Sequence, residues 1–469
     1  MRTKKVGDKV EAKHRLRRSL GSFDLFLLGI GAVIGTGIFV LTGIAAANQS
    51  GPGIVLSFAI AGVVCIFAAL AYAELASSVG GAGSAYSYSY ATIGELVAWI
   101  IGWDLILEYI VSVPAISLGW SGYAQNILQN IGFTLPTYLA KSWYEGDGGF
   151  VNLPAMMIIL VLMVILNAGS KQGARLNAGI VFIKVLTIAV FIGVALFHID
   201  PNNWVPFMPY GWFGHDASGN PVGIFAGAAI VFFAFLGFDA VSTAAEESKN
   251  PQKDMPFGII GSLLFCTAAY IIVSLLLTGI ISYKELAVAS PVAFALQKVG
   301  VGWAAALISV GALAGITSVM LVMFYGATRL VFAIARDGLL PYGLTSVSQR
   351  SGVPSLIITV LGIAIALIAG FFPLQALAEL INIGTLAAFV LVCLGVALLR
   401  KTHPKLRRPF KSPLGITGSI IGAILCFGLM LALPTITWWR FLLWMLVGLI
   451  IYLTYGRFHS RLAVKKSKR

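Results

Sequence analysis

Long apolar runs recur along almost the whole chain and leave few residues for connecting segments. A helix needs roughly 20 predominantly apolar residues to cross the hydrocarbon core of a bilayer, which is about 30 Å thick. Hydrophobic residues make up 58% of the 469 positions, and charged residues only 11% against a usual share of about 25%. The sequence therefore predicts an all-α polytopic membrane protein with twelve transmembrane helices, at approximately residues 23–47, 53–77, 94–124, 152–169, 176–199, 223–245, 256–281, 302–334, 354–371, 374–399, 415–435 and 438–456.

The 32 lysine and arginine residues are distributed unevenly between the two sides of such a topology. With the N-terminus inside, most of them fall in the two tails and the inner loops, and only Lys141, Lys284, Lys298 and Arg440 fall outside. An excess of basic residues in cytoplasmic loops is what normally orients a membrane protein. The net charge of +14 therefore indicates two cytoplasmic termini and a lipid bilayer as surroundings, and no nucleic-acid partner.

The residues that usually carry enzyme chemistry are few and scattered. The four cysteines lie far apart within apolar spans, and their spacing matches neither a disulfide framework nor a metal site. The five histidines fall at membrane edges, in loops or in tails: His14, His198, His215, His403 and His459. We therefore expect no enzyme, no metal and no cofactor.

The first apolar span contains the stretch "GIGAVIGTGIF", residues 29–39, with four glycines in nine positions. Glycine within a helix costs about 0.5–1 kcal/mol relative to alanine, so this span is weak at its centre. If the helix unwinds around Gly35, Thr36 and Gly37, backbone N–H groups there need a polar partner within the membrane. They would suit a carboxylate. The alternative is a packing face formed by Gly31 and Gly35.

The sixth apolar span, "IFAGAAIVFFAFLGFDAVSTAAEE", is also interrupted by a glycine near its middle, at Gly237. Interrupted segments in corresponding positions of two halves are a sequence indication of a transporter binding site. Because spans one and six are five helices apart, the second half would enter the membrane from the opposite side. One break offering amides and another offering carbonyls would recognise a zwitterion, which predicts a free amino acid as the substrate.

Four stretches resemble the amino acid–polyamine–organocation transporter superfamily: "FDLFLLGIGAVIGTGIF", "WDLILEYIVSVPAISLGWSGY", "FFAFLGFDAVSTAAEESKNPQKDMP" and "MLVMFYGATRLVFAIARDGLLP". The resemblance runs from about residue 19 to about 455 and is strongest to bacterial homologues of the cationic amino acid transporters. It implies a bacterial plasma-membrane protein with a five-plus-five inverted-repeat fold and helices 1 and 6 broken. The implied parts are a basic cytoplasmic tail (1–22), a first repeat of helices 1–5 (23–199), a second repeat of helices 6–10 (223–400), helices 11 and 12 (401–456) and a basic cytoplasmic tail (457–469).

The resemblance also implies a binding site made of backbone groups. Carried over by motif, the substrate carboxylate would be held by the amides of Gly35, Thr36 and Gly37. The α-amino group would be held by the carbonyls of Val33, Phe233 and Leu236. Phe233 would also be the aromatic lid on the outer side, although the stretch "FFAF" offers neighbouring rings for that role.

Lys184 lies within the fifth apolar span, where a charged side chain has to face the interior of the bundle. Removal from water disfavours the ammonium form, so a lysine here would release its proton more readily. In proton-driven members of the superfamily, a lysine of the fifth helix takes the place of a sodium ion between helices 1 and 8. We therefore expect Lys184 to couple transport to H⁺. A structurally paired lysine is the alternative, and Thr317 and Ser318 could supply oxygen ligands to sodium.

Two carboxyl groups of span three, Asp104 and Glu108, share a helix face because they are four residues apart. The resemblance implies that Glu108 lies beside the substrate cavity, where it would exchange protons or orient the side-chain subsite. A structural hydrogen bond or ion pair is favoured for Asp104. The role of Asp239 stays open. The charges at inner helix ends would form either a gate or solvated caps: Glu246, Glu247, Arg329, Arg336 and Asp337.

Met320 and Met323 on span eight bear on selectivity, because flexible methionine side chains fill gaps and would narrow a pocket. Met323 is the expected side-chain contact of the substrate. The sequence thus predicts proton-coupled import of small or medium neutral L-amino acids by alternating access. A transporter or exchanger of arginine and lysine, and a transporter-like amino acid sensor, are the alternatives. Whether a small membrane subunit associates with the chain is not determined by the sequence.

Overall fold

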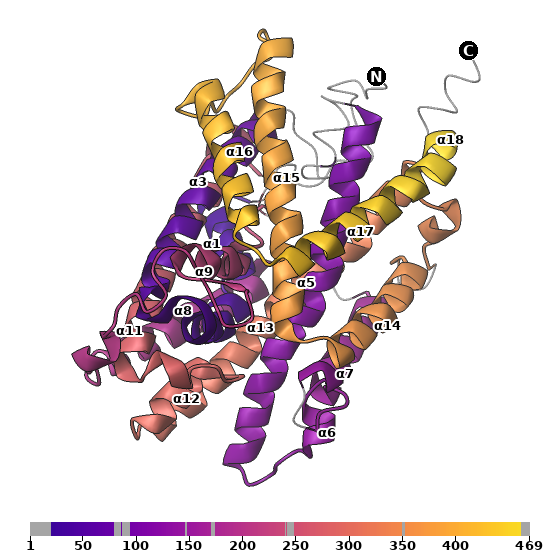
Figure 1. Cartoon of the computed structure of the whole chain (residues 1–469). Helices are drawn as coiled ribbons and strands as arrows, with labels where there is room; N and C mark the ends of the chain where they lie inside the picture. Colours follow the sequence, from indigo (N-terminus) through magenta and orange to yellow (C-terminus); the bar gives the residue numbers. More distant parts are fainter. Residues whose placement is uncertain are drawn as a thin grey trace, which may run out of the picture.

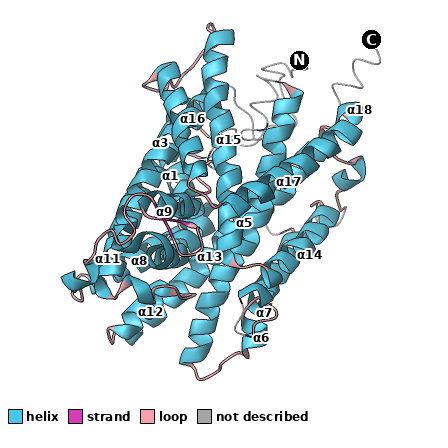
Figure 2. Cartoon of the chain, in the orientation of Figure 1, coloured by secondary structure: helices cyan, strands magenta, loops and turns pink. Residues whose placement is uncertain are grey.

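The computed structural model of the chain describes residues 20–78, 86, 94–145, 148–169, 174–239, 241, 248–348 and 352–460. Most of these residues are helical, and the helices pack side by side as one elongated bundle (Figure 1). The strand content of the described chain is a short antiparallel pair in the loop before α9 (Figure 2).

Each of the twelve apolar runs contains an apolar helix or part of one. The main helices are α1 (Ser22–Val33), α3 (Ile54–Ser78), α5 (Glu95–Asn130), α7 (Leu153–Asn167), α8 (Ala174–Ala195), α9 (Ile224–Val231), α11 (Pro251–Ile280), α13 (Gly302–Arg336), α14 (Ser355–Phe371), α15 (Leu374–Thr402), α16 (Gly415–Leu431) and α17 (Thr435–Ile451).

Shorter elements connect or extend these helices. The short α-helices are α2 (Thr42–Ala45), α6 (Thr137–Ala140), α12 (Pro291–Lys298) and α18 (Arg457–His459). The 3₁₀ and π turns are η2 (Gly37–Leu41), η3 (Ala46–Ser50), η4 (Gly51–Gly53), η5 (Trp143–Glu145), η6 (Pro201–Trp204), η7 (Phe232–Phe235), η9 (Tyr283–Glu285), η10 (Tyr342–Thr345) and η11 (Tyr452–Gly456), and the strands are β1 (Gly214–His215) and β2 (Pro221–Val222).

Within the described residues, six helical stretches are long and apolar enough to cross a membrane, judged by length and composition: Gly37–Ser78, Glu95–Asn130, Pro251–Ile280, Gly302–Arg336, Leu374–Thr402 and Thr435–His459. Shorter apolar helices account for the other predicted runs. The fold is therefore that of a multi-helix membrane protein, as the sequence predicts. The proposed boundaries between repeats stay a prediction.

Glycine allows the helices around the centre of the bundle to approach closely. An added Cβ at Gly62 of α3 would lie 2.6 Å from Thr267 of α11, and one at Gly258 of α11 would lie 2.7 Å from Leu25 of α1. Small residues at such contacts let helix backbones pack where no hydrophobic driving force exists between helices. These contacts tie α1, α3 and α11 together around the broken segments.

The first apolar run is a broken helix. The segment α1 ends at Val33, Ile34 adopts an extended conformation, and helical geometry resumes in η2 from Gly37. The sixth run is broken as well. Its helix α9 continues into η7, which ends at Phe235; Leu236 then leaves the helical conformation, and Gly237 has φ of +99°. The predicted interruption of helices 1 and 6 is therefore confirmed.

The two breaks lie directly against each other. A methyl group at Gly37 would overlap the backbone of Ala234, and a Cβ at Gly237 would lie 2.9 Å from the carbonyl oxygen of Ala32. A glycine of each break thus faces the backbone of the other helix. Because a positive φ also strains any L side chain, Gly237 is required on two grounds.

A buried carboxylate fastens the end of α3 to the segment that follows α15. Glu74 is 1% exposed and accepts hydrogen bonds from Arg400 Nε at 2.8 Å, from Arg400 Nη2 at 2.5 Å and from the Ser412 amide at 2.9 Å. Arg408 Nε lies 3.4 Å from the same carboxylate. This charge is therefore paired on several sides.

Candidate functional site

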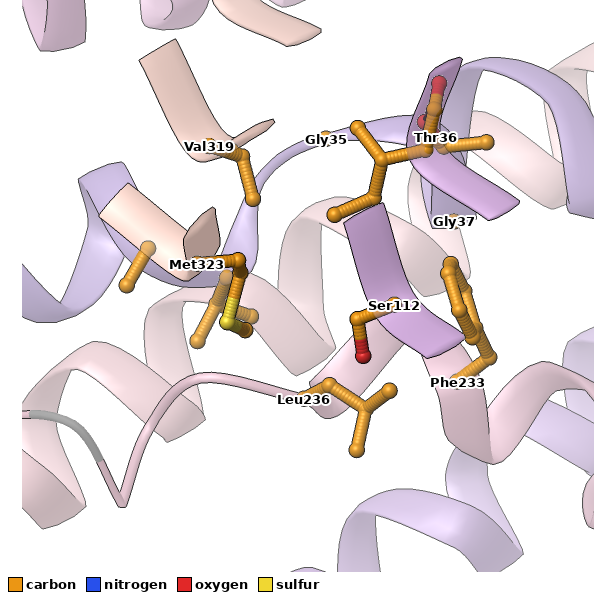
Figure 3. Close-up of a pocket in the computed structure, with 11 residues that line it drawn as sticks. Gly35, Thr36, Gly37, Ser112, Phe233, Leu236, Val319 and Met323 are labelled. Carbon is orange, nitrogen blue, oxygen red and sulfur yellow. Dashed lines mark hydrogen bonds between the residues drawn. The ribbon is translucent and has the colours of Figure 1, made fainter. Parts of the chain in front are cut away.

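A pocket with an empty volume of about 270 Å³ lies between the two helix breaks. Figure 3 shows Val319 and Met323 on one side of it and Phe233 on the other. The lining residues come from both breaks, from α5 and from α13: Ala32, Val33, Gly35, Thr36, Gly37, Ser112, Ile116, Phe233, Leu236, Val319 and Met323. All predicted backbone-site residues are among them. Their assigned contacts with a substrate stay predictions.

The first break presents unpaired donors to this pocket. The amide of Ile34 donates to the Ile30 carbonyl at 3.0 Å, and the Gly35 carbonyl accepts from the Phe39 amide at 3.4 Å. Between them, the amides of Gly35, Thr36 and Gly37 find no acceptor among the described residues. Buried backbone N–H groups are nearly always paired, so three together mark a place for an anionic group.

The carbonyl groups at the breaks are partly engaged within the protein. The Tyr270 hydroxyl of α11 lies 2.9 Å from the Val33 oxygen and 2.8 Å from the Ala234 oxygen. The Phe233 carbonyl accepts from the Leu236 amide at 3.2 Å. Because a carbonyl oxygen can accept two hydrogen bonds, the Val33 and Phe233 oxygens each keep one position for a further donor.

A side chain of α15 donates hydrogen bonds to backbone carbonyls in the last turn of α9. Asn382 is fully buried, and its Nδ2 donates to the Ala229 carbonyl at 2.7 Å and to the Ile230 carbonyl at 2.9 Å. These carbonyls precede the break. The side chain of Asn382 therefore satisfies backbone groups that an interrupted helix leaves open.

Sequence reasoning missed the pocket residues of α5 and one of those of α13. Ser112 and Ile116 of α5 line the pocket, and the Ile116 carbonyl accepts from the Thr36 hydroxyl at 3.3 Å. Val319 of α13 lies against Gly35, where an added Cβ would be 3.2 Å from it. Regular helices carry no local irregularity that marks such residues. The spacing of Val319 and Met323, four residues apart, was the available signal.

Lys184 is fully buried and lies outside the pocket lining. Its Nζ donates to the Gly31 carbonyl of α1 at 2.6 Å. Its aliphatic chain lies against Gly315 of α13, where an added Cβ would meet Lys184 Cγ at 3.0 Å. The structure thus places Lys184 between helices 1 and 8, as the resemblance implies. Its role in coupling stays a prediction.

The oxygen atoms of the sodium alternative are engaged with neighbouring groups. The Thr317 hydroxyl accepts from Trp120 Nε1 at 3.0 Å and donates to the Leu313 carbonyl at 2.6 Å. The Ser318 hydroxyl donates to the Gly315 carbonyl at 2.9 Å. The end of the Lys184 side chain lies near the helix turn at Gly315, where an added Cβ would be 3.2 Å from Lys184 Cε. The choice between sodium and proton coupling stays a prediction.

The Glu108 side chain is not among the groups that line the pocket. It is 2% exposed and lies one helical turn before Ser112, whose hydroxyl donates to the Glu108 carbonyl at 2.5 Å. Asp104 and Asp239 are buried near it. A direct contact of Glu108 with a substrate stays a prediction.

Two of the charges at the inner helix ends, Arg329 and Asp337, have local partners. The Arg329 guanidinium lies over the Tyr325 ring, 4.4 Å from its centroid. Asp337 accepts from the Tyr86 hydroxyl at 2.9 Å. Glu246 and Glu247 of the predicted gate lie outside the described residues.

The two methionines of α13 differ in position. Met323 lines the pocket, whereas Met320 is fully buried elsewhere in the bundle. Only the former can limit the space beside a substrate side chain. The prediction that a methionine narrows the pocket therefore applies to Met323 and not to Met320.

The sequence pattern of the amino acid permease family matches residues 20–453, which is nearly the whole chain. The chain belongs to the amino acid permease family. This permease is 49% identical to the branched-chain amino acid permease BcaP of Bacillus subtilis (strain 168), over 98% of both chains. It is 47% identical to the methylthioribose transporter of the same strain, over 95% of both chains.

More distant relatives include the cationic amino acid transporters. This permease is 35% identical to the vacuolar cationic amino acid transporter 4 of Arabidopsis thaliana, over 84% of this chain and 65% of that protein. The superfamily inferred from the four motifs is therefore confirmed. Because the relatives are permeases and transporters, the expectation that the chain is not an enzyme is confirmed as well.

Proposed function

We propose that this permease is a secondary active transporter that imports small or medium neutral L-amino acids together with protons. Family membership supports amino acid transport as the general activity. The Bacillus subtilis relatives support a bacterial plasma-membrane location, and the charge distribution supports two cytoplasmic termini. Import then proceeds by alternating access around the pocket between the two helix breaks.

One observation carries the proposal: three unpaired amides of one break face a pocket whose other wall is the second break. The amides of Gly35, Thr36 and Gly37 can hold a carboxylate. The carbonyl oxygens of Val33, in the first broken helix, and of Phe233, in the second, can accept from an ammonium group. The two sets of groups fit the two ends of a free amino acid.

A neutral side chain fits the rest of the lining. The side chains that line the pocket are apolar or hydroxyl-bearing, with Ile116, Leu236, Val319 and Met323 among them, and none is charged. A guanidinium or ammonium side chain would need an acceptor that this lining does not offer.

Proton coupling is proposed from the position of Lys184. Its ammonium group donates to the Gly31 carbonyl, two residues before the end of α1. Loss of the proton leaves a neutral amine, which holds that carbonyl more weakly than the charge-assisted bond does. Protonation of Lys184 is thereby linked to the conformation of the first break.

The test is uptake into proteoliposomes with a panel of twenty amino acids and methylthioribose, under an imposed proton or sodium gradient. We expect concentrative uptake of small and medium neutral amino acids that depends on the proton gradient. Uptake of arginine or lysine alone would support the cationic alternative. Uptake that follows sodium and ignores pH would contradict the role given to Lys184, and binding without transport would support a sensor.

A further inference from the structure

A groove lies between α5 and α17, where α17 crosses α5 (Figure 1). Its cavity volume is about 300 Å³, which reaches the range of small-molecule sites, roughly 300–1,000 Å³. The residues that line it are aromatic, aliphatic or glycine: Trp99, Ile100, Trp103, Leu442, Met445, Leu446, Gly448 and Leu449. The groove shares no lining residue with the substrate pocket, so it is a separate hollow.

Two buried tryptophans of α5 form the floor of the groove, and hydrogen bonds to α17 hold them there. Trp99 Nε1 donates to the Gly448 carbonyl at 2.9 Å, and Trp103 Nε1 donates to the Trp444 carbonyl at 2.8 Å. The Trp103 ring stacks on both other indoles, with centroid distances of 5.6 Å to Trp99 and 4.6 Å to Trp444. Because their N–H groups are satisfied, these indoles present apolar ring surface to the groove.

A glycine of α17 brings the two helices together beside this floor. An added Cβ at Gly448 would overlap the Trp103 ring, so α17 touches α5 where it carries no side chain. Leu446 and Leu449, on either side of Gly448, are exposed and form the rim. The groove is therefore fixed by close packing and by hydrogen bonds, and it opens outward.

The surroundings of α17 determine what fills the groove. In the stretch Thr435–His459, 22% of the most apolar part is buried inside the protein, against 50–78% in the other five long apolar stretches of the described chain. Most of α17 thus faces lipid. An unfilled hollow would lose dispersion contacts along its lining, and water gains no hydrogen bonds from an apolar one. The bilayer supplies hydrocarbon that suits this lining.

The rim of the groove continues along α17 to a cation. Beyond Leu449, the same helix face passes through Leu453 to Arg457, at intervals of four residues, and all three are exposed. Helical geometry runs unbroken from α17 through η11 into α18. At 1.5 Å per residue, Arg457 lies about 12 Å beyond Leu449 along the helix axis. An arginine at a helix end extends to the membrane surface, where it can bind a phosphate.

We propose that this groove binds one acyl chain of a phospholipid whose phosphate lies beside Arg457. The lipid belongs to the leaflet on the side of α18, which is the inner leaflet in the proposed topology. The indole floor holds the chain, and the guanidinium holds the phosphate. The site does not depend on which substrate the permease carries.

Photocrosslinking in proteoliposomes tests the acyl-chain site. The probe is phosphatidylglycerol with a diazirine in one acyl chain, present at a small mole fraction among unlabelled phospholipids. After illumination, mass spectrometry of peptides locates the adducts. We expect severalfold more adducts on the groove residues than on Ile363 and Leu367, which are exposed apolar residues of α14. Equal labelling of the two surfaces would indicate ordinary bilayer contact and would overturn the proposal.

Leu446→Trp and Leu443→Trp form a matched pair of variants. Both leucines are exposed on α17, at 53% and 63%, but of the two Leu446 alone lines the groove. The larger side chain at position 446 fills the hollow and should reduce the groove adducts severalfold, whereas Leu443→Trp should leave them unchanged. Because both positions are exposed, neither variant is expected to unfold. No loss in Leu446→Trp, or an equal loss in both variants, contradicts the proposal.

Arg457→Gln tests the phosphate contact. Native mass spectrometry of protein released from the same vesicles counts the phospholipid molecules that stay bound. We expect severalfold lower retention in Arg457→Gln than in the wild-type protein. Arg440→Gln removes a cation near the opposite end of α17 and should retain lipid as the wild type does. Equal retention in the two variants would overturn the assignment of the phosphate to Arg457.

A second copy of the chain is the competing occupant of the groove. Leu446→Cys introduces a thiol at the rim, and the four native cysteines are buried. We expect oxidation in vesicles to give no disulfide-linked dimer through this thiol; such a dimer would overturn the lipid site in favour of an interface between copies. None of these measurements uses amino acid uptake, so this inference and the proposed function can fail independently.

Discussion

Gly37 and Ala234 are in direct backbone contact, so that a methyl group at Gly37 would overlap the Cα atom of Ala234. Gly37 begins the second part of the first broken helix, and Ala234 lies in the turn just before the second break. The pocket exists because the two interrupted helices meet there without side chains between them. Its backbone groups are thereby exposed to a substrate from both sides.

Gly37→Ala is expected to reduce amino acid uptake by more than about tenfold. Overpacking costs about 1–3 kcal/mol, and here the obstacle is backbone that cannot move aside. Uptake into proteoliposomes at matched protein levels measures the effect. The control is Gly428→Ala on α16, whose added methyl meets nothing within 4 Å and should leave uptake unchanged. Equal uptake by the two variants would show that the contact is unimportant.

Lys184→Ala is expected to abolish accumulation against a gradient while amino acid binding persists. The variant loses the ammonium group that donates to the Gly31 carbonyl, but the pocket lining is intact. Substrate-dependent thermal stabilisation measures binding, and the ratio of internal to external substrate measures accumulation. Lys284→Ala, at an exposed position, serves as the control. Undiminished accumulation by Lys184→Ala would refute the coupling role.

Met323→Ala is expected to raise uptake of large neutral amino acids relative to alanine, because it enlarges the pocket. Met320→Ala removes the same side chain from a buried position on the same helix, outside the pocket. Both variants should lose about 2–5 kcal/mol of stability from the cavity that truncation leaves. Competition uptake with the amino acid panel measures selectivity. A similar change in both variants would argue against a pocket role for Met323.

Glu74→Gln is expected to destabilise the fold by about 3–5 kcal/mol, because Arg400 and Arg408 then lose their buried counter-charge. The melting temperature in detergent measures the loss. Glu285→Gln breaks an exposed pair with Lys298, whose Nζ lies 2.5 Å from the carboxylate, and should cost at most about 1 kcal/mol. Comparable melting temperatures for the two variants would contradict the contribution assigned to the buried pair.

The sequence was sufficient to locate both helix breaks, because their causes are local. An interrupted helix in the membrane leaves backbone groups without hydrogen bonds, which costs free energy. Several glycines around Gly35 and one at Gly237 weaken the two helices locally and so mark where the interruptions occur. The burial of Lys184 was equally predictable from the cost of exposing a charge to lipid. The family motifs then led to the pocket residues of both breaks.

The remaining features depend on packing between distant helices. Ser112 and Ile116 lie on a regular stretch of α5, and only the approach of the first break makes them pocket residues. The partner of Lys184, Gly31, is separated from it by 153 positions. Glu108 was expected beside the cavity and is not among the pocket-lining residues. The close approach of α15 to Asp104 through Gly384, where an added Cβ would lie 2.8 Å from Oδ1, depends in the same way on packing between distant helices.

The Tyr270 hydroxyl carries a single hydrogen atom yet lies within hydrogen-bond distance of two carbonyl oxygens, one from each broken helix. Rotation of the hydroxyl about the phenolic C–O bond can redirect its hydrogen bond from the Val33 carbonyl oxygen to the Ala234 carbonyl oxygen. If one broken helix moves away, the hydroxyl can donate to the carbonyl of the other helix and is not left without a hydrogen bond in the apolar interior. The Tyr270 hydroxyl can therefore keep a hydrogen-bond acceptor on either broken helix.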